Sequence, residues 1–227
     1  ESAADVQAAV RFADDNGLRV SARGSGHHFA LLSMQEGVLI DLSRLNSLDI
    51  DTATSTSRVG PTLTNGELAA ALGKADLAFP VGHCASVSLS GYLLGGGLGW
   101  NSGAWGIACH NVLEVEVVLA DGSLVTASDT QNPDIFWAVR GAGPEFFGIV
   151  TSYRLRLQPM PRAIRTSVWT YPLQRIAEVE RWMTAIMATA PNTLEFSAVM
   201  TAAPPPLAEL TAHTVSAVAT VFADSEA

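Results

Sequence analysis

A glycine-rich run inside an apolar stretch is the feature that most constrains how this chain can fold. Within residues 88–99, glycine recurs at Gly91, Gly95, Gly96, Gly97 and Gly99. A glycine inside a helix costs about 1 kcal/mol relative to alanine, so this run needs a reason. Two reasons are open: a flat or anionic ligand that approaches the backbone, or close packing of a helix against a sheet. A Walker-type nucleotide loop is excluded because no Gly-Lys-Ser/Thr occurs.

A second glycine-bearing loop lies near the start of the chain. It consists of Arg23, Gly24, Ser25, Gly26, His27 and His28. Two glycines separated by one residue let backbone N–H groups converge on an anion, and Arg23 would add positive charge. A plain turn between two strands explains the loop equally well. The loop does not match the dinucleotide fingerprint of a Rossmann unit, because the further glycine that opens a helix is absent.

Histidines and cysteines gather around both loops. They are His27, His28, His83, Cys84, Cys109 and His110. These residue types bind zinc, but no Cys-x-x-Cys or His-x-x-x-His spacing occurs, so we expect no metal site. Two cysteines are also too few for a disulfide framework, and a single disulfide between them is the one alternative left.

Helical and strand patterns are mixed along the chain. Helical spacing covers residues 5–16, 65–74 and 132–139, with Thr64 or Asn65 as the N-cap of the second helix. Strand patterns cover residues 18–22, 38–42, 52–59, 112–120, 123–127 and 148–157. Asp121-Gly122 predicts a hairpin between two of these strands. We therefore expect an α+β fold rather than a doubly wound parallel sheet.

The pattern changes after residue 158. A proline-containing segment at 158–161 precedes a strand near 164–170, a helix from 173 to roughly 188, and apolar stretches near 194–200 and 215–222. We expect one domain over residues 1–158 and the beginning of a second over residues 159–227. The chain opens inside a helical pattern without Met, and the second domain does not finish. We therefore expect a segment cut at both ends, and the compartment stays unassigned.

Composition excludes several classes of protein. The chain has 227 residues, of which 48% are hydrophobic, and a net charge of -9. No basic cluster occurs, so we expect no nucleic-acid partner. No apolar run reaches the roughly 18 residues that span a bilayer, so we expect a soluble chain with no membrane partner. Tyr92, Trp100, Trp105 and Trp137 are expected in the core more often than around a pocket.

Five motifs, taken in order, carry a resemblance to a known family. They are residues 22–27, 79–84, 90–100, 117–122, and 132–141 with 148–151. Together they resemble the PCMH-type FAD-binding domain of the vanillyl-alcohol-oxidase superfamily, with its berberine-bridge-enzyme-like branch as the closer match. The resemblance implies a two-subdomain FAD-binding domain followed by an incomplete substrate domain.

The resemblance implies FAD as the cofactor and assigns two covalent attachment points. By position, His27 would bond the C8 methyl of the isoalloxazine ring and Cys84 would bond C6, as in the bicovalent subset of the family. Two bonds fix the ring and tend to raise its redox potential. Further cofactor contacts implied by position are Arg23, Gly24, Ser25, Gly26, His28, Gly82, Ser88, Gly91, Gly95, Gly96, Asn111, Gly148, Ile149 and Val150. Among these, the N–H groups of residues 24–26 would bind phosphate, and residues 148–150 would lie at the adenine end.

The implied activity is that of an FAD-linked oxidase. A small-molecule alcohol or C–H donor would give a hydride to the flavin, and O2 would take the electrons to give H2O2. Val87 matches the position that gates oxygen, where valine resembles the oxidases, although an ordinary buried valine explains it equally. Two alternatives are a dehydrogenase that uses another acceptor and a non-catalytic flavin-binding fragment. The family's catalytic base lies in the missing part, so we assign none here and expect this chain alone to be inactive.

Overall fold

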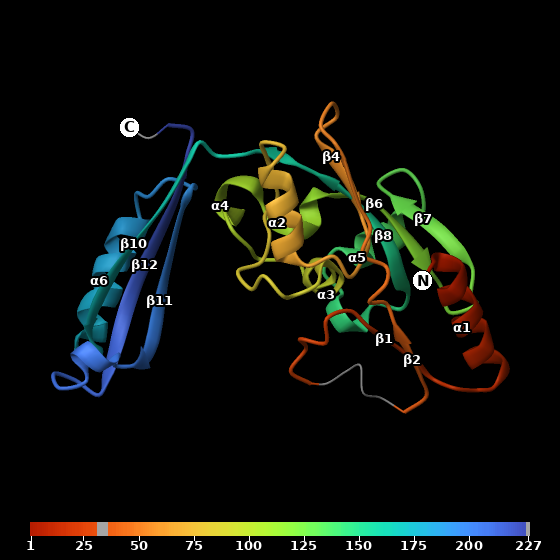
Figure 1. The fold of residues 1–227 in the computed structure, drawn as a ribbon, viewed down its shortest axis with the longest axis horizontal. Helices are drawn as coiled ribbons and strands as arrows, with labels where there is room; N and C mark the ends of the chain where they lie inside the picture. Colours follow the sequence, from red (N-terminus) through yellow and green to blue (C-terminus); the bar gives the residue numbers. More distant parts are fainter. Residues whose placement is uncertain (31–35, 226–227) are drawn as a thin grey trace. The chain divides into compact units, whose positions relative to one another are not determined.

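A computed structural model describes residues 1–30 and 36–225 of the chain. They form two compact units, Glu1–Met160 and Pro161–Ala227, and each is described by itself (Figure 1). Both units mix helices with antiparallel sheet, and the expected α+β class is confirmed. Within the described residues, every helix is too short or too polar to cross a bilayer.

The first unit opens with a helix and two parallel strands. Helix α1 spans Ala3–Asp15, where Ser2 and Asp5 form a capping box. Strands β1 (Val20–Arg23) and β2 (Val38–Asp41) pair in parallel. Val6 and Val10 of the helix pack against Ile40 of β2. The predicted helix is confirmed, and Gly17 follows it with a φ of +64°, the left-handed position that ends helices.

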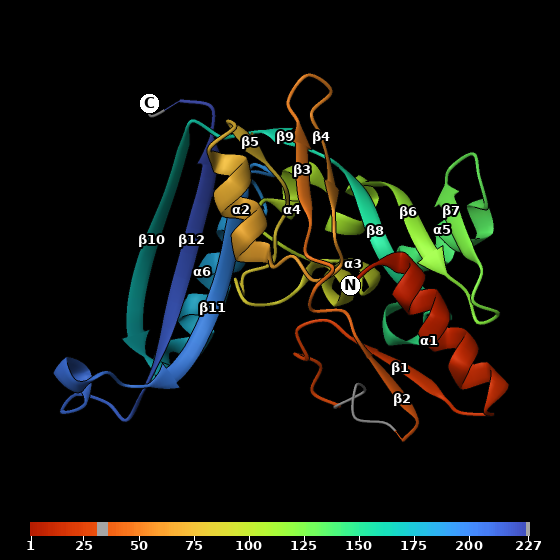
Figure 2. The ribbon, with the colours of Figure 1, turned by 45° about the vertical axis from the view of Figure 1, so that its right-hand side comes forward.

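A five-stranded antiparallel sheet forms the centre of this unit, in the order β3-β4-β8-β6-β7 (Figure 2). Its strands are β3 (Leu48–Asp51), β4 (Thr56–Val59), β6 (Val112–Val118), β7 (Leu124–Ser128) and β8 (Ile149–Arg156). The hairpin expected at Asp121-Gly122 is confirmed between β6 and β7. On β8, the Tyr153 hydroxyl lies 3.2 Å from Ser90 Oγ, directly before the glycine-rich run that begins at Gly91.

The strand predicted over residues 52–59 is wrong in its first half. Residues 52–55 form the turn between β3 and β4, and only Thr56–Val59 is a strand. The cause is Asp51, whose carboxylate accepts hydrogen bonds from the N–H groups of Ala53 (2.9 Å) and Thr54 (3.2 Å). Such side-chain bonds to the following backbone favour a turn over an extended chain.

Short helices cover the sheet and carry the apolar core. They are α2 (Asn65–Gly73), α3 (Leu89–Leu94), α4 (Ser102–Trp105), α5 (Pro133–Val139), η2 (Ala108–Asn111) and η3 (Gly143–Glu145). Their buried side chains and those of the sheet include Leu68, Leu72, Leu89, Leu93, Phe136, Val115, Tyr153 and Leu155. A two-residue pair, β5 (Leu77–Ala78) with β9 (Gln158–Pro159), ties the end of this unit to its middle.

One of the four aromatic residues expected in the core lies outside it. Tyr92 and Trp100 pack against the core, and Trp105 is half-buried. Trp137 is 77% exposed, although its neighbour Phe136 is fully buried. Both lie on α5, where adjacent residues point about 100° apart, so only one of them faces the sheet.

The second unit is a three-stranded sheet with one helix on its face. Strands β10 (Ala163–Pro172), β11 (Leu194–Ala202) and β12 (His213–Ala223) pair antiparallel in the order β10-β12-β11. Helix α6 (Ile176–Met187) follows the short η4 (Leu173–Arg175), and η5 spans Pro205–Leu207. The predicted strand and helix of this region are confirmed.

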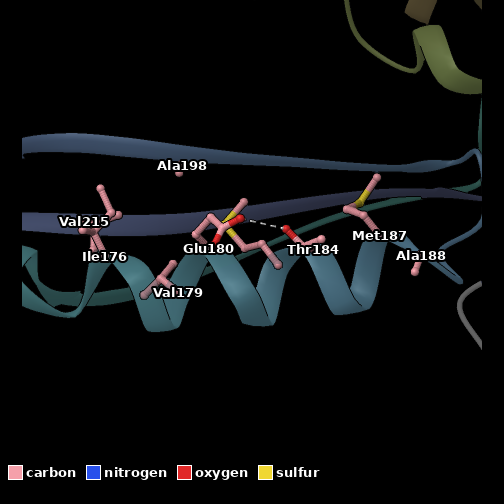
Figure 3. Close-up of a pocket in the computed structure, with 9 residues that line it drawn as sticks. Ile176, Val179, Glu180, Thr184, Met187, Ala188, Ala198 and Val215 are labelled. Atoms are coloured by element: carbon pink, nitrogen blue, oxygen red, sulfur yellow. Dashed lines mark hydrogen bonds between the residues drawn. The ribbon is translucent and has the colours of Figure 1, made fainter.

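Aromatic and apolar side chains join α6 to the sheet. Trp182 stands edge-on between Trp169 and Phe196, with ring centroids 5.5 and 5.3 Å apart. A hollow beside the helix is lined by Val179, Met183, Met187 and Val215, among others (Figure 3). Its polar side chains, Glu180 and Thr184, hydrogen-bond to each other, so the hollow presents no converging reactive groups.

Candidate cofactor site

Two loops far apart in sequence meet in the first unit. One is residues 24–28, after β1, and the other is residues 82–88, before α3. Ser25 and Ser88 join them reciprocally: the Ser88 N–H donates to Ser25 Oγ (2.9 Å), and the Ser25 N–H donates to Ser88 Oγ (3.1 Å). A Cβ at Gly24 would stand 2.5 Å from Ser88 Oγ, so this contact requires the glycine.

The second loop is held by the first turn of α2. Thr64 caps this helix in a capping box with Glu67, which resolves the two N-caps expected. The N–H groups of Asn65 and Gly66 donate to the loop carbonyls of Val87 (3.0 Å) and Ala85 (2.9 Å). The first amides of a helix have no acceptor within the helix, so the loop carbonyls supply the acceptors for these two.

The Asn65 side chain clamps both ends of the same loop. Its Oδ1 accepts from the Gly82 N–H (2.8 Å), and its Nδ2 donates to the Val87 carbonyl (2.9 Å). Asn65 is 1% exposed, so its amide depends on these partners. The loop therefore has one conformation fixed by buried hydrogen bonds.

The imidazole of His27 and the thiol of Cys84 converge on Ser86. His27 Nε2 lies 3.1 Å from Ser86 Oγ, and Cys84 Sγ lies 3.5 Å from the same oxygen. His27 Nδ1 lies 3.0 Å from Ser25 Oγ. Both side chains are exposed. The two nucleophilic groups are thus within two hydrogen-bond lengths of each other and open to a ligand.

The two cysteines have opposite environments. The hydroxyl and N–H of Ser86 hold the pKa of the Cys84 thiol below its usual value, because they donate hydrogen bonds to the thiolate. Burial raises the pKa of the Cys109 thiol, which is 1% exposed. Both thiols are free, so the nucleophilic one is Cys84.

The glycines of the run 91–99 fall into two groups. Gly97 has a φ of +76°, and a Cβ there would lie 2.7 Å from Ala108 Cβ. A Cβ at Gly99 would lie 2.1 Å from Tyr92 Oη and 2.3 Å from the Val81 carbonyl oxygen. Packing accounts for these two glycines.

Gly91 has no such packing reason. It lies inside α3, it is exposed, and a Cβ there would have no described heavy atom within 4 Å apart from its chain neighbours and the backbone of its own helix. Gly95 and Gly96 form the end of α3: the N–H of Gly95 donates to Gly91 O, and that of Gly96 donates to Leu93 O. The open space at Gly91 fits a flat ligand that approaches the backbone closely.

Several predicted contacts have protein partners that the sequence did not indicate. The Ser25 N–H donates to Ser88 Oγ, which Gly24 allows to approach, and its expected contact with phosphate stays a prediction. The Arg23 guanidinium pairs with the Asp41 carboxylate. His28 Nδ1 accepts from the Ala30 N–H (3.1 Å), and Gly26 takes a left-handed φ of +74°.

Asn111, at the end of η2, is buried among protein partners. Its Nδ2 donates to the Trp105 carbonyl (3.0 Å), and its Oδ1 accepts from Gln158 Nε2 (3.3 Å). These bonds give the side chain a structural role. Its contact with a cofactor stays a prediction.

Gly148 directly precedes the central strand β8, and Ile149 and Val150 begin it. A Cβ at Gly148 would lie 2.5 Å from Val117 Cγ1, so strand packing requires this glycine. Ile149 is half-buried, and the Val150 side chain is in the core. Their place at the adenine end of a cofactor stays a prediction.

No cluster of three or more His, Cys, Asp or Glu side chains suited to a metal occurs within residues 1–30 and 36–225.

Two residues of the site were missed from the sequence, Asn65 and Ser86. The Thr64-x-x-Glu67 capping pattern locates Asn65 as the first residue of α2. No sequence motif predicts the hydrogen-bond partners of Asn65 or Ser86.

Comparisons with known proteins connect the chain to FAD-binding domains. A family model described as FAD binding domain matches residues 1–128. (R)-6-hydroxynicotine oxidase of Paenarthrobacter nicotinovorans is 36% identical over 187 residues, which are 82% of this chain and 40% of the relative. Berberine bridge enzyme-like 24 of Arabidopsis thaliana is 33% identical over 187 residues, 78% of this chain and 34% of the relative. The chain spans less than half the length of these curated relatives.

Solved structures share the fold. 6-Hydroxy-D-nicotine oxidase from Arthrobacter nicotinovorans matches with a TM-score of 0.87 and 31% identity, over 97% of this chain and 48% of that one. Wild-type Phl p 4.0202, a glucose dehydrogenase, matches with 0.85 and 28%, over 97% and 44%. An isoleucine-to-valine variant of Phl p 4, a glucose oxidase, matches with 0.84 and 28%, over 97% and 44%. The expected PCMH-type FAD-binding fold is confirmed by such neighbours.

Proposed function

This chain belongs to the family of FAD-binding domains shared by berberine-bridge-enzyme-like and other FAD-linked oxidoreductases, and from that membership we propose that it holds FAD covalently through His27 and Cys84 as part of an oxidase. The observation that carries this proposal is the convergence of both nucleophiles on one hydroxyl, Ser86 Oγ. The C8 methyl and C6 positions lie on the same six-membered ring of the flavin. Two attacking atoms within two hydrogen-bond lengths of each other suit that spacing.

The surrounding residues fit a flat ring system. Gly91 leaves its backbone uncovered, and the loop of residues 82–88 is already fixed by Asn65. His27 and Cys84 would hold FAD, and each attachment would replace one C–H bond of the cofactor by a bond to the His27 nitrogen or the Cys84 sulfur. One proton would leave the side chain and one the carbon, and O2 would take the two electrons and become H2O2.

FAD, when bound, supplies the acceptance of a hydride from a small-molecule alcohol or C–H donor. The chain's own residues hold and orient the ring. O2 is the proposed electron acceptor, supported by the relatives that are oxidases and by valine at position 87. A dehydrogenase with another acceptor is the second candidate, because wild-type Phl p 4.0202 is a glucose dehydrogenase.

The attachment is tested with the purified chain and added FAD in air. We expect a yellow precipitate after acid treatment and an intact mass raised by one FAD per chain, because a covalent bond survives denaturation. Colourless protein of unchanged mass would contradict the covalent proposal. Yellow native protein that loses its colour in acid would leave FAD binding in place and reject the attachment.

Oxygen access is tested at Val87. Its backbone is fixed, since its N–H donates to the Cys84 carbonyl (3.3 Å) and its own carbonyl accepts from Asn65. We expect Val87→Ile to slow the reoxidation of dithionite-reduced flavin by O2 about tenfold, a barrier increase of ~1.4 kcal/mol, because the added methylene narrows the space beside the ring. Stopped-flow absorbance measures the rate, and Val87→Ala is the matched control that keeps access open. Equal rates for wild type and Val87→Ile would reject the gate, and slow reoxidation of the wild type would favour the dehydrogenase.

A further inference from the structure

We propose that Ser86 is the positioning residue of the attachment site: its hydroxyl hydrogen-bonds to both the His27 imidazole and the Cys84 sulfur, and so sets the orientation of both nucleophiles before FAD arrives. The inference deepens the proposed covalent attachment and rests on it. Its basis is geometric, since one oxygen lies 3.1 Å from His27 Nε2 and 3.5 Å from Cys84 Sγ.

Two serines hold the imidazole of His27, one at each ring nitrogen. A serine hydroxyl has one hydrogen to donate and two lone pairs to accept. Ser25 Oγ accepts from the Ser88 N–H (2.9 Å), donates to Ser88 Oγ (3.2 Å) and lies 3.0 Å from His27 Nδ1. When Cys84 is a thiolate, the Ser86 hydroxyl hydrogen can only be donated to the sulfur, and a Ser86 lone pair is left for His27 Nε2. Each serine thus fixes the position of one nitrogen of the ring.

The turn that carries Ser86 holds the hydroxyl in place. The Val87 N–H donates to the Cys84 carbonyl (3.3 Å), and the Gly66 N–H donates to the carbonyl of Ala85. Ser86 therefore lies in a closed turn whose far side is bound to α2. A residue so placed keeps its side chain on the side of the thiol without help from a ligand.

Hydrogen bonding rather than a neighbouring charge favours the thiolate. The lowered pKa of Cys84 comes first from the Ser86 hydroxyl, then from the Ser86 N–H, and burial opposes them. The titratable side chains of the two loops besides Cys84 are His27, His28 and His83. Glu67, in the first turn of α2, bonds to Thr64.

The experiment first uses the chain without FAD. Iodoacetamide alkylation of Cys84 is followed by intact mass between pH 5 and 10 for wild type, Ser86→Ala and Ser86→Thr. Because the Ser86 hydroxyl stabilises the thiolate, we expect Ser86→Ala to move the midpoint of the pH–rate profile to higher pH. Ser86→Thr keeps the hydroxyl and should restore the profile. Cys84→Ala confirms the labelled site, and continued protection of the buried Cys109 confirms that each variant is folded.

The second readout is the fraction of chain that keeps FAD after acid precipitation. Ser86→Ala should lower this fraction and Ser86→Thr should restore it, whereas Ser47→Ala, an exposed serine of the same unit, should change neither readout. An unchanged alkylation profile in Ser86→Ala would overturn the inference even if FAD attaches normally. A shifted profile in a chain whose wild type never retains FAD would overturn the attachment itself, so the two failures are distinguishable.

Discussion

Replacing both His27 and Cys84 with alanine is expected to release all FAD on acid precipitation, whereas either single replacement should leave FAD attached. The reason is that both side chains lie within hydrogen-bond distance of Ser86 Oγ, so each could bond to the same flavin ring without the other. Intact mass of the denatured chain measures the result: one FAD on wild type and on each single variant, and none on His27→Ala/Cys84→Ala. The single variants should also differ in visible absorbance, since one has only a C–N bond and the other only a C–S bond.

His28→Ala is the matched control for this series. His28 is the adjacent imidazole, it is also exposed, and it bonds to the N–H of Ala30 rather than to the serines. We expect this variant to keep FAD through acid precipitation as the wild type does, because the contact implied for His28 is not covalent. Release of FAD by His28→Ala, or its retention by the double variant, would place the attachment elsewhere.

Gly99→Ala is expected to destabilise the first unit by about 3 kcal/mol or more, at the upper end of the range for overpacking. A Cβ there would lie 2.1 Å from Tyr92 Oη, 2.3 Å from Val81 O and 2.7 Å from Pro80 O. Two of the three atoms are backbone carbonyls, and Tyr92 is held by its hydrogen bond to the Pro80 carbonyl. The segment cannot yield without moving the backbone that leads into the Cys84 loop. Urea unfolding followed by tryptophan fluorescence measures the loss.

Gly91→Ala separates packing from ligand contact in the same run. The space in front of Gly91 is open among the described residues, so alanine should stabilise the FAD-free chain by up to about 1 kcal/mol through its helix propensity. The same methyl should weaken FAD binding if the ring lies against α3. A Gly91→Ala chain that is more stable and binds FAD as well as wild type would remove Gly91 from the site. Little loss of stability in Gly99→Ala would contradict the packing account of the run.

Local chemistry made part of the fold predictable. Thr64 and Glu67 mark the start of α2, and Asp121-Gly122 marks the β6–β7 hairpin, because both are short-range patterns with few alternatives. The strand predicted over residues 52–59 began too early because Asp51 turns the chain through side-chain bonds that a strand pattern does not include. Trp137 was expected in the core from its residue type and is exposed. Burial depends on which face of the helix meets the sheet, and residue type does not specify that face.

Of the candidate site, the sequence indicated the two nucleophilic side chains but not the contacts that bring them together. His27 and Cys84 stand in recognisable motifs, but their convergence depends on hydrogen bonds between distant residues, 59 positions apart for His27 with Ser86 and 63 for Ser25 with Ser88. The contacts of Ser25 with Ser88 and of Arg23 with Asp41 were not predicted, because both are tertiary contacts. Long-range hydrogen bonds of this kind leave no periodic trace in a sequence.

The attachment of the Cys84 loop to the first turn of α2 has a consequence for motion. Opening the loop would remove the hydrogen-bond acceptors of the Asn65 and Gly66 N–H groups and both partners of the Asn65 side chain. Each buried group left unpaired costs about 1–3 kcal/mol. Fraying of the first turn of α2 and opening of the loop are therefore coupled and rare. The conformational entropy of this segment is lost when the chain folds, so under the proposed attachment FAD would meet a rigid thiol and would spend little of its affinity on ordering it.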